Sequence, residues 1–243
     1  MDKYPKSGKY DPAWVQENWM GPHPLWLLEE LCENMNLSPG KRVLDMGCGK
    51  GLTSVFLAKE YGVTVFANDL WIDPTENWRR FEKAGVSDRV FPIRAEAHAL
   101  PYAEGFFDAI VAVDSYHYFG TEESYFGTFL KLVKGGGETG IVVPGLAREH
   151  EAGYPPAMAR FWQSTHELFT FHSKDWWRRH WAKTGLADIT ACYDIDDPHG
   201  IWREWAHWSA EHLPESMGFS DTEFLAADTN GDIALIAMVA KKL

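Results

Sequence analysis

Short apolar runs alternate with amphipathic stretches over the first 145 residues of the chain. Five of the apolar runs have the length of short strands: 42–46, 63–67, 89–93, 107–113 and 139–143. Stretches between them repeat apolar residues at helical intervals, which predicts helices at 50–61, 73–84 and 121–134. Strands that alternate with helices predict an α/β fold with a doubly wound, mostly parallel sheet.

The pattern changes on either side of this region. A helix is expected at 22–37, where Pro24 suits a first turn. After Pro144 the alternation stops, and 145–171 is predicted as an inserted helical segment. The remaining elements are expected as a helix at 173–183, a strand at 187–193, an aromatic-rich insertion at 194–222 and a last strand at 233–240.

A glycine-rich loop follows the first predicted strand, in the sequence VLDMGCGKG at 43–51. Ligands of open α/β sheets bind at the carboxyl ends of the strands, and glycines let the backbone approach them closely. The dinucleotide fingerprint has a third glycine where this chain has Leu52. Asp45 just before the loop suits a cation better than a phosphate. The loop therefore favours S-adenosylmethionine (SAM), which carries a sulfonium and an ammonium but no phosphate.

Polar residues also follow the next predicted strands. Asp69 is expected to accept hydrogen bonds from a ribose diol, and Glu96 from an adenine amino group beside the Ala97 backbone. Asp114 follows the fourth strand, where it can contact the amino-acid end of the cofactor. His117 is the candidate general base because its pKa lies near neutral pH. The alternative is that His117 packs beneath the cofactor or caps the next helix.

Together these residues resemble the class I SAM-dependent methyltransferases, most of all the group with the ubiquinone/menaquinone C-methyltransferases and many small-molecule enzymes. Four segments carry the resemblance, in the order VLDMGCGKG, ANDL, EAHALPYAEGFFDAIV and LVKGGG. HSKDWWRRHWAKTGLADI resembles the family's late helix and sixth strand. The resemblance covers about 24–145 and, less closely, 172–193.

The resemblance implies a Rossmann-like sheet of seven strands whose last strand is antiparallel. It implies a cofactor site lined by Asp45, Gly47, Cys48, Gly49, Asp69, Leu70, Glu96, Ala97 and Asp114. The reaction would move a methyl group from SAM to an O, N, S or C nucleophile of a small molecule. The chain is expected as a single domain over 1–243, with a SAM-binding core at 38–144, a lid at 1–37 and caps at 145–171 and 194–222.

Charge narrows the choice of partners. Lys and Arg number 23 and Asp and Glu 35, which gives a net charge of −12. An acidic chain is a poor ligand for nucleic acid or anionic membranes. No apolar run has the length of a membrane span, and three scattered cysteines indicate free thiols, so a cytoplasmic protein is expected. The histidines match no ordered zinc spacing, and no metal is assigned. The oligomeric state stays open.

Twelve tryptophans are the unusual feature of the composition. Trp202, Trp205 and Trp208 recur every three residues. They either form an aromatic pocket for a flat or cationic substrate or anchor the inserted helices on the sheet. Tyr10, Trp14 and Trp19 are candidates for the lid.

Two other functions stay open at this point. One is a nicotinamide oxidoreductase on the same core, against which Leu52 argues. The other is a non-catalytic protein that binds SAM. A third possibility is methylation of a protein or nucleic acid. The acidic charge weakens the nucleic-acid version, and the sequence DSYH at 114–117 stands where an Asn-Pro-Pro-Tyr-like motif would follow the fourth strand.

Overall fold

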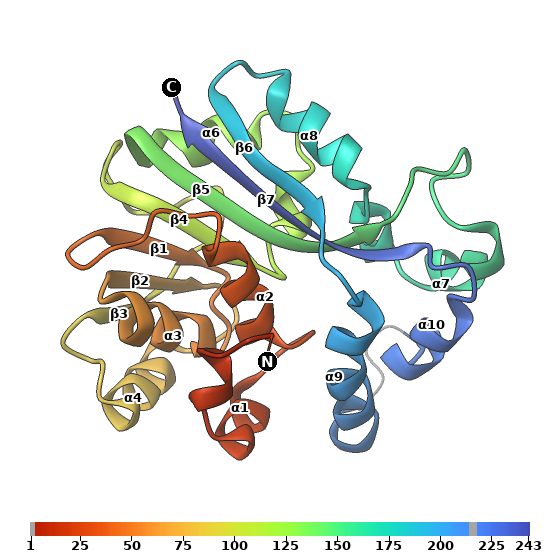
Figure 1. The fold of residues 1–243 in the computed structure, drawn as a ribbon, viewed down its shortest axis with the longest axis horizontal. Helices are drawn as coiled ribbons and strands as arrows, with labels where there is room; N and C mark the ends of the chain where they lie inside the picture. The colour runs from red at the N-terminus through yellow and green to blue at the C-terminus, as the bar shows by residue number, and fades with distance from the viewer. Residues whose placement is uncertain (1–2, 214–217) are drawn as a thin grey trace.

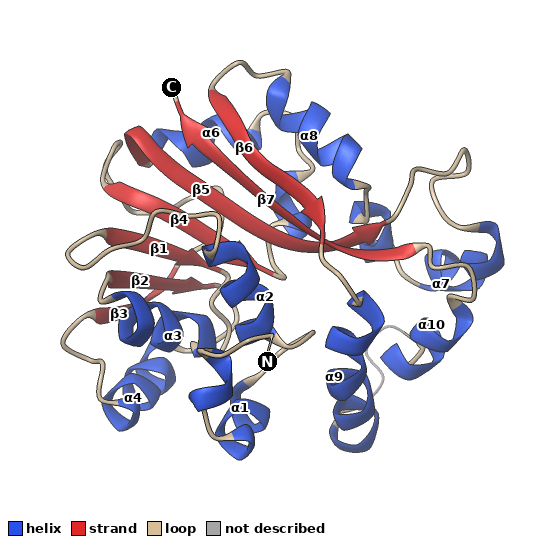
Figure 2. Ribbon diagram, in the orientation of Figure 1, coloured by secondary structure: helices blue, strands red, loops and turns tan. Residues whose placement is uncertain are grey.

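The computed structural model describes residues 3–213 and 218–243, and within them seven strands form one sheet (Figures 1 and 2). The strand order is β3-β2-β1-β4-β5-β7-β6. The strands are β1 Arg42–Met46, β2 Thr64–Asp69, β3 Val90–Arg94, β4 Phe107–Val113, β5 Val133–Leu146, β6 Ala187–Asp194 and β7 Ile233–Lys242. β1 to β5 pair in parallel, and β7 is antiparallel to both β5 and β6. The predicted fold class is confirmed.

Helices cover both faces of the sheet (Figure 2). The α-helices are α1 Pro12–Asn18, α2 Pro24–Cys32, α3 Leu52–Tyr61, α4 Pro74–Ala84, α5 His117–Gly120, α6 Tyr125–Lys131, α7 Ala159–Ser164, α8 Lys174–Ala182, α9 Pro198–His212 and α10 Asp221–Ala227. Short 3-10 turns lie at Ser7–Lys9, Pro156–Met158 and Glu167–Thr170.

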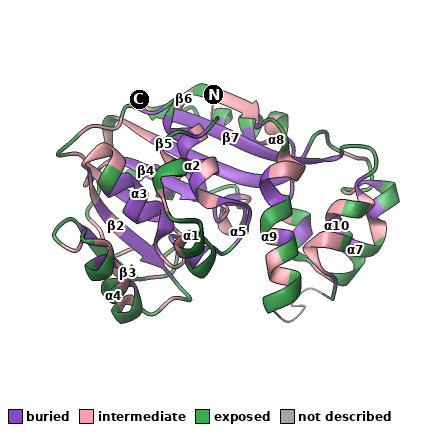
Figure 3. Ribbon diagram, turned by 60° about the horizontal axis from the view of Figure 1, so that its bottom comes forward, coloured by how far each residue is buried: buried purple, intermediate pink, exposed green. Residues whose placement is uncertain are grey.

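The alternation of side chains along the central strands builds two separate cores. Val43 and Val111 belong to the core that α2 and α3 cover, whereas Leu44 and Ile110 belong to the core beneath α6 and α8. This is the period of two that places successive residues of a strand on opposite faces. Burial is continuous over the inner strands and is lost on the outer surfaces of α1, α4 and α9 (Figure 3). A sheet covered on both faces leaves only its strand ends open for a site.

Local sequence explains the helix starts. The Asp73 carboxylate accepts a hydrogen bond from Thr75 N–H at 2.8 Å, and Pro74 takes the first helical position of α4. Ser173 caps α8 through Trp176 N–H at 3.3 Å. Both caps confirm the starts predicted from sequence.

The helix predicted at 22–37 is too long, because α2 ends at Cys32. The chain turns there so that Asn36 N–H can donate to the Glu138 carboxylate at 2.7 Å. Met35 packs so closely over Gly140 of β5 that a Cβ there would lie 2.6 Å from the Met35 sulfur. Contact with β5 overrides the helical periodicity.

The predicted helix 121–134 and the glycine turn behind it also need correction. The structure has the short helix α5 and then α6, and β5 begins at Val133. Gly135, Gly136 and Gly137 lie inside β5, where its pairing with β4 shifts. Phe107 pairs with Val133 and Ala109 with Glu138, so the glycines take up the extra residues of a bulge.

The two insertions lie together at one end of the molecule (Figure 1). Residues 145–171 supply α7 and two 3-10 turns, and the second insertion supplies α9, against which α10 packs. Residues 214–217, within the insertion predicted at 194–222, lie outside the described residues. In the described parts of the chain, no helix combines the length and apolar character needed to cross a membrane.

Gly51 offers a test of the packing behind the glycine loop. It has a φ of +84°, and a Cβ would lie 2.4 Å from the fully buried Phe81 ring. Gly51→Ala should lower the free energy of unfolding by about 2–4 kcal/mol, from left-handed strain and overpacking together. Urea denaturation measures the loss.

Gly85→Ala is the matched control. Gly85 is also left-handed, with a φ of +71°, but nothing lies within 4 Å of a Cβ there. This variant should lose about 1 kcal/mol from backbone strain alone. Equal losses for the two variants would show that Phe81 does not require the glycine.

Candidate active site

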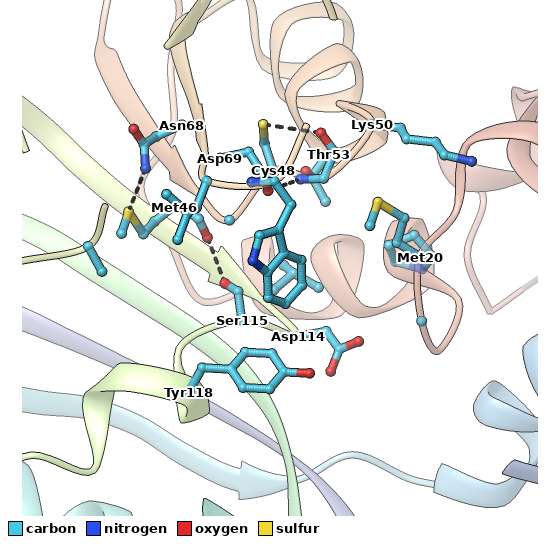
Figure 4. A pocket seen from close by; sticks show the side chains of 18 of the residues that line it. Met20, Met46, Cys48, Lys50, Thr53, Asn68, Asp69, Asp114, Ser115 and Tyr118 are labelled. Carbon is cyan, nitrogen blue, oxygen red and sulfur yellow. Dashed lines mark hydrogen bonds between the residues drawn. The ribbon is translucent and has the colours of Figure 1, made fainter. Parts of the chain in front are cut away.

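A cavity of about 310 Å³ opens at the carboxyl ends of β1, β2 and β4, and we call it the first cavity (Figure 4). Its size lies at the lower end of the range usual for small-molecule sites. Most of the residues predicted for the cofactor line it: Gly47, Cys48, Gly49, Asp69, Leu70, Glu96, Ala97 and Asp114. The structure therefore brings together residues from four separate segments of the sequence.

The glycine loop is held tightly against the neighbouring strands. Gly47 N–H and Cys48 N–H both donate to the Asn68 carbonyl, at 2.8 and 3.0 Å. Gly47 has a φ of +73°, and a Cβ on it would lie 2.4 Å from Ser115 Cβ. Ser115 in turn donates its hydroxyl to the Met46 carbonyl at 2.6 Å (Figure 4). Only glycine fits at position 47, because the loop lies directly on the end of β4.

Asp69 links the loop to the end of β2. One carboxylate oxygen accepts from Gly49 N–H at 2.8 Å, and the other accepts from the N–H groups of Trp71 and Ile72 at 2.8 and 2.9 Å. A carboxylate has about four lone-pair sites, so these three bonds leave capacity for a ligand hydroxyl. The buried carboxylate thus shapes the site and still faces the cavity.

Asp45 does not line the cavity. Its carboxylate is buried and accepts from the hydroxyls of Thr53 and Ser54, both at 2.6 Å. Burial raises the pKa of Asp45 to about 6, although the two hydroxyl groups act in the opposite direction. Thr53 does line the cavity, so Asp45 acts on the site through the start of α3.

The rim of the first cavity carries residues that sequence reasoning missed. The Glu96 carboxylate accepts from His98 N–H at 2.7 Å and lies 2.9 Å from His98 Nδ1. The hydrogen bond from the His98 side chain lowers the pKa of Glu96. Trp71 is 68% exposed, and its ring meets the Tyr118 ring edge-on at 6.0 Å. A tryptophan two residues after Asp69 was the signal that the sequence offered.

A second cavity of about 340 Å³ adjoins the first. The two share the wall formed by Met20, Gly21, Pro22, Asp114 and Tyr118. Asp114 has a φ of +53°, a conformation rare for residues other than glycine and concentrated at functional sites. Gly21 has a φ of +153°, which residues with a side chain rarely adopt, and a Cβ on it would lie 2.0 Å from an Asp114 carboxylate oxygen, so both features favour glycine there. Burial raises the pKa of Asp114 well above its usual range.

His117 lines the second cavity and not the first. Its side chain is 2% exposed, and burial lowers its pKa to about 3. Among the described residues, its Nδ1 has no hydrogen-bond partner. The ring packs against Tyr118 and meets Phe171 edge-on. His117 is therefore a neutral imidazole in the wall of the second cavity.

Some tryptophans line a cavity and others only pack in the core, so both roles considered from sequence occur. Trp202 and Trp205 line the second cavity, and Trp205 Nε1 donates to the Asp221 carboxylate at 2.7 Å. Trp177 and Trp181 are fully buried against Tyr116 and serve as packing. Sequence reasoning missed Asp221 and Glu167, since a single acidic residue near a helix start gives no signal of a cavity.

The chemistry of the first cavity fits a cationic nucleoside. Its lining holds the carboxylates of Asp69, Glu96 and Asp114 and one lysine, Lys50, which donates to the Glu17 carbonyl at 3.1 Å. A pyrophosphate would meet the negative side chains of Asp69 and Glu96 there, whereas a sulfonium and an ammonium are attracted to them. Gly47 and Gly49 line the cavity without side chains, so a ligand can approach the backbone there.

Known proteins that are similar to this chain are methyltransferases. A family model described as a methyltransferase domain matches residues 43–137. The chain is 33% identical over 116 residues to methyltransferase GfsG of Streptomyces halstedii, covering 47% of this chain and 42% of that protein. It is 28% identical over 200 residues to a sarcosine/dimethylglycine N-methyltransferase of Halorhodospira halochloris, covering 80% and 69%.

Solved structures share the fold. Geranyl diphosphate C-methyltransferase from Streptomyces coelicolor, in complex with Mg²⁺, geranyl diphosphate and S-adenosyl-L-homocysteine, superposes with a TM-score of 0.70 at 16% identity. The match covers 96% of this chain and 88% of that one. The chain spans less than half the length of the first curated relatives it matches.

The sheet order and the helices on both faces match the Rossmann-like fold of methyltransferases, and residues 43–137 match a methyltransferase domain. The predicted resemblance to the class I SAM-dependent methyltransferases is confirmed, and SAM is the cofactor of that class. The family match favours this class over a nicotinamide oxidoreductase.

The buried Asp45 predicts a pH-dependent stability. Its pKa is higher in the folded protein than in the unfolded chain, so the folded state binds its proton more tightly. The resulting contribution to stability is complete below about pH 4 and is lost as pH rises to about 6. Asp45→Asn keeps an oxygen for both hydroxyls and should raise the free energy of unfolding by roughly 1–3 kcal/mol at pH 8 but little at pH 4.

Urea denaturation of both proteins at pH 4 and pH 8 measures this difference. Asp88→Asn is the control, because Asp88 is exposed and its carboxylate pairs with Arg89 next to it. An Asp45→Asn effect of equal size at both pH values would contradict the raised pKa.

Proposed function

We propose that this chain transfers a methyl group from SAM, held in the first cavity, to a small molecule held in the second. The observation that carries this proposal is that two cavities of small-molecule size are adjacent. They share lining residues, among them Gly21 and Asp114. The names of similar proteins support a small acceptor: one relative is a sarcosine/dimethylglycine enzyme, and one neighbour holds geranyl diphosphate.

Each carboxylate of the first cavity has a separate task in this proposal. Asp69 accepts hydrogen bonds from the ribose, and Glu96 accepts from the adenine amino group beside Ala97. Asp114 contacts the ammonium group at the amino-acid end of SAM. Gly47, Cys48 and Gly49 provide the backbone surface, Leu70 contributes at the rim, and Asp45 holds the start of α3 through Thr53 and Ser54.

The protein's main contribution is alignment. SAM supplies a methyl group already activated by the sulfonium, so the chain gains most by positioning the acceptor behind it. His117, with its pKa lowered to about 3, is too weak a base to hold a proton near neutral pH. We assign it the role of a neutral hydrogen-bonding and packing partner of the acceptor.

The outer segments complete the proposed site. Residues 1–37 act as a lid, which is supported by the presence of Asn18, Met20 and Pro24 in the lining of the first cavity. The caps at 145–171 and 194–222 supply Leu168 and Trp202 to the second cavity. The single domain over 1–243, the lack of a nucleic-acid or membrane partner and the cytoplasmic location stay predictions.

Methyl-labelled SAM and a panel of small acceptors test the function. We expect label in an acceptor, read by mass, with an equal amount of S-adenosylhomocysteine. Asp69→Ala should weaken S-adenosylhomocysteine binding in calorimetry by more than about tenfold, since the ribose and Gly49 N–H both lose their acceptor. Asp88→Ala, remote from the cavity, should leave the affinity unchanged.

The outcomes separate the alternatives. Unchanged affinity in a folded Asp69→Ala protein would remove Asp69 from the site. Cofactor binding without transfer to any acceptor would favour the non-catalytic alternative. Absence of binding in the wild-type protein would refute the proposal.

His117 is tested by a pair of variants once an acceptor is known. His117→Ala should lower kcat/KM for the acceptor by about tenfold or more while cofactor affinity stays within about twofold. His117→Asn retains a neutral polar group and should recover part of the loss. If both variants abolish turnover and the wild-type rate follows a single ionisation near pH 6–7, His117 is a base instead.

A further inference from the structure

The second cavity combines aromatic walls with acidic side chains. Trp202, Trp205, Phe171, Phe219 and Phe224 form much of its apolar lining. Asp114, Glu167 and Asp221 are its carboxylates, and no lysine or arginine is among the described residues that line it. Ring faces and carboxylates both attract positive charge, so this lining is suited to a cation and unsuited to an anion.

The three carboxylates come from different parts of the chain but act at one place. Asp114 follows β4, Glu167 begins a 3-10 turn of the first insertion, and Asp221 begins α10. Burial raises the pKa of Tyr118, and the charges of all three carboxylates raise it further. The Tyr118 hydroxyl therefore lies within the field of all three. Trp205 Nε1 fixes Asp221 by donating to its carboxylate at 2.7 Å.

The carboxylates that line the second cavity do not form a metal-ligand cluster among the described residues. Among the described residues, no group of three or more Asp, Glu, His or Cys side chains is arranged to hold a metal ion. His117, which is 2% exposed and lines the cavity, has an Nδ1 without a hydrogen-bond partner in the described chain. This nitrogen is therefore available for a hydrogen bond with a polar group in the cavity.

We infer that the second cavity binds a small organic amine and that the methyl acceptor is its nitrogen. This inference rests on the proposed function and specifies its substrate class. The amine arrives as an ammonium ion among the carboxylates, and Asp221 or Glu167 takes its proton. The freed lone pair then forms the N–C bond as the C–S bond breaks, and the electrons of that bond remain on sulfur, which becomes a neutral thioether. The methylated amine carries the positive charge away.

A pair of probes with the same shape tests the preference for charge. Choline carries a quaternary ammonium, and 3,3-dimethylbutan-1-ol is its neutral counterpart. Calorimetry with the full chain saturated with S-adenosylhomocysteine should show choline bound at least about tenfold more tightly than the alcohol. Equal affinities, or tighter binding of the alcohol, would overturn the inference without any variant.

Variants of the carboxylates then show which side chains attract the charged probe. Asp221→Asn and Glu167→Gln should each weaken choline binding about threefold or more and leave the alcohol unchanged. Glu204→Gln is the matched control, since Glu204 lies exposed on α9, the helix that carries Trp202 and Trp205. Equal loss for both probes would show that the variants disturb the cavity and would contradict a charge-specific role.

The same experiment separates this inference from the proposed function. If S-adenosylhomocysteine binds but choline is not preferred, the methyltransferase proposal stands and the amine acceptor is wrong. If S-adenosylhomocysteine does not bind, both fail. In the labelled-SAM panel, amines should accept the methyl group, and transfer only to phenols, thiols or carboxylates would likewise refute the amine acceptor.

Discussion

The attachment of the glycine loop to the ends of β2 and β4 is the constraint on which the site depends. Hydrogen bonds from the loop to the Asn68 carbonyl and the Asp69 carboxylate hold one side, and the absence of a Cβ at Gly47 lets the loop lie on Ser115. Because these contacts fix the backbone between three strand ends, they define the floor of the first cavity.

Acidic side chains then favour cations over anions as ligands of both cavities. Asp114 lies in their common wall, with Glu96 on one side and Glu167 and Asp221 on the other. The overall acidity of the chain acts in the same direction at long range. A sulfonium that donates a methyl group and an amine that accepts it are both favoured by such a field. The left-handed backbone at Asp114 is the conformational cost of this arrangement.

The sequence predicted those features that depend on residues close together in the chain. The caps at Asp73 and Ser173, the alternation of strands and helices, and the glycine loop all follow from neighbouring residues, and the lining of the first cavity followed from motif order. Contacts between distant segments were not predictable. Met35 ends α2 because β5 lies beside it, and Glu167 and Asp221 line the same cavity only through the folding of the two insertions. Asp45 was assigned to the cofactor, but the hydroxyls of Thr53 and Ser54 hold it beneath the loop.

A crystal structure with S-adenosylhomocysteine is the most direct test of this account. We expect the ribose to contact Asp69 and the adenine to lie beside Glu96 and Ala97. The thioether sulfur should lie near Asp114 and face the second cavity. A ligand that lies across Gly47 and Gly49 with a pyrophosphate, or a sulfur atom that faces away from the shared wall, would contradict it.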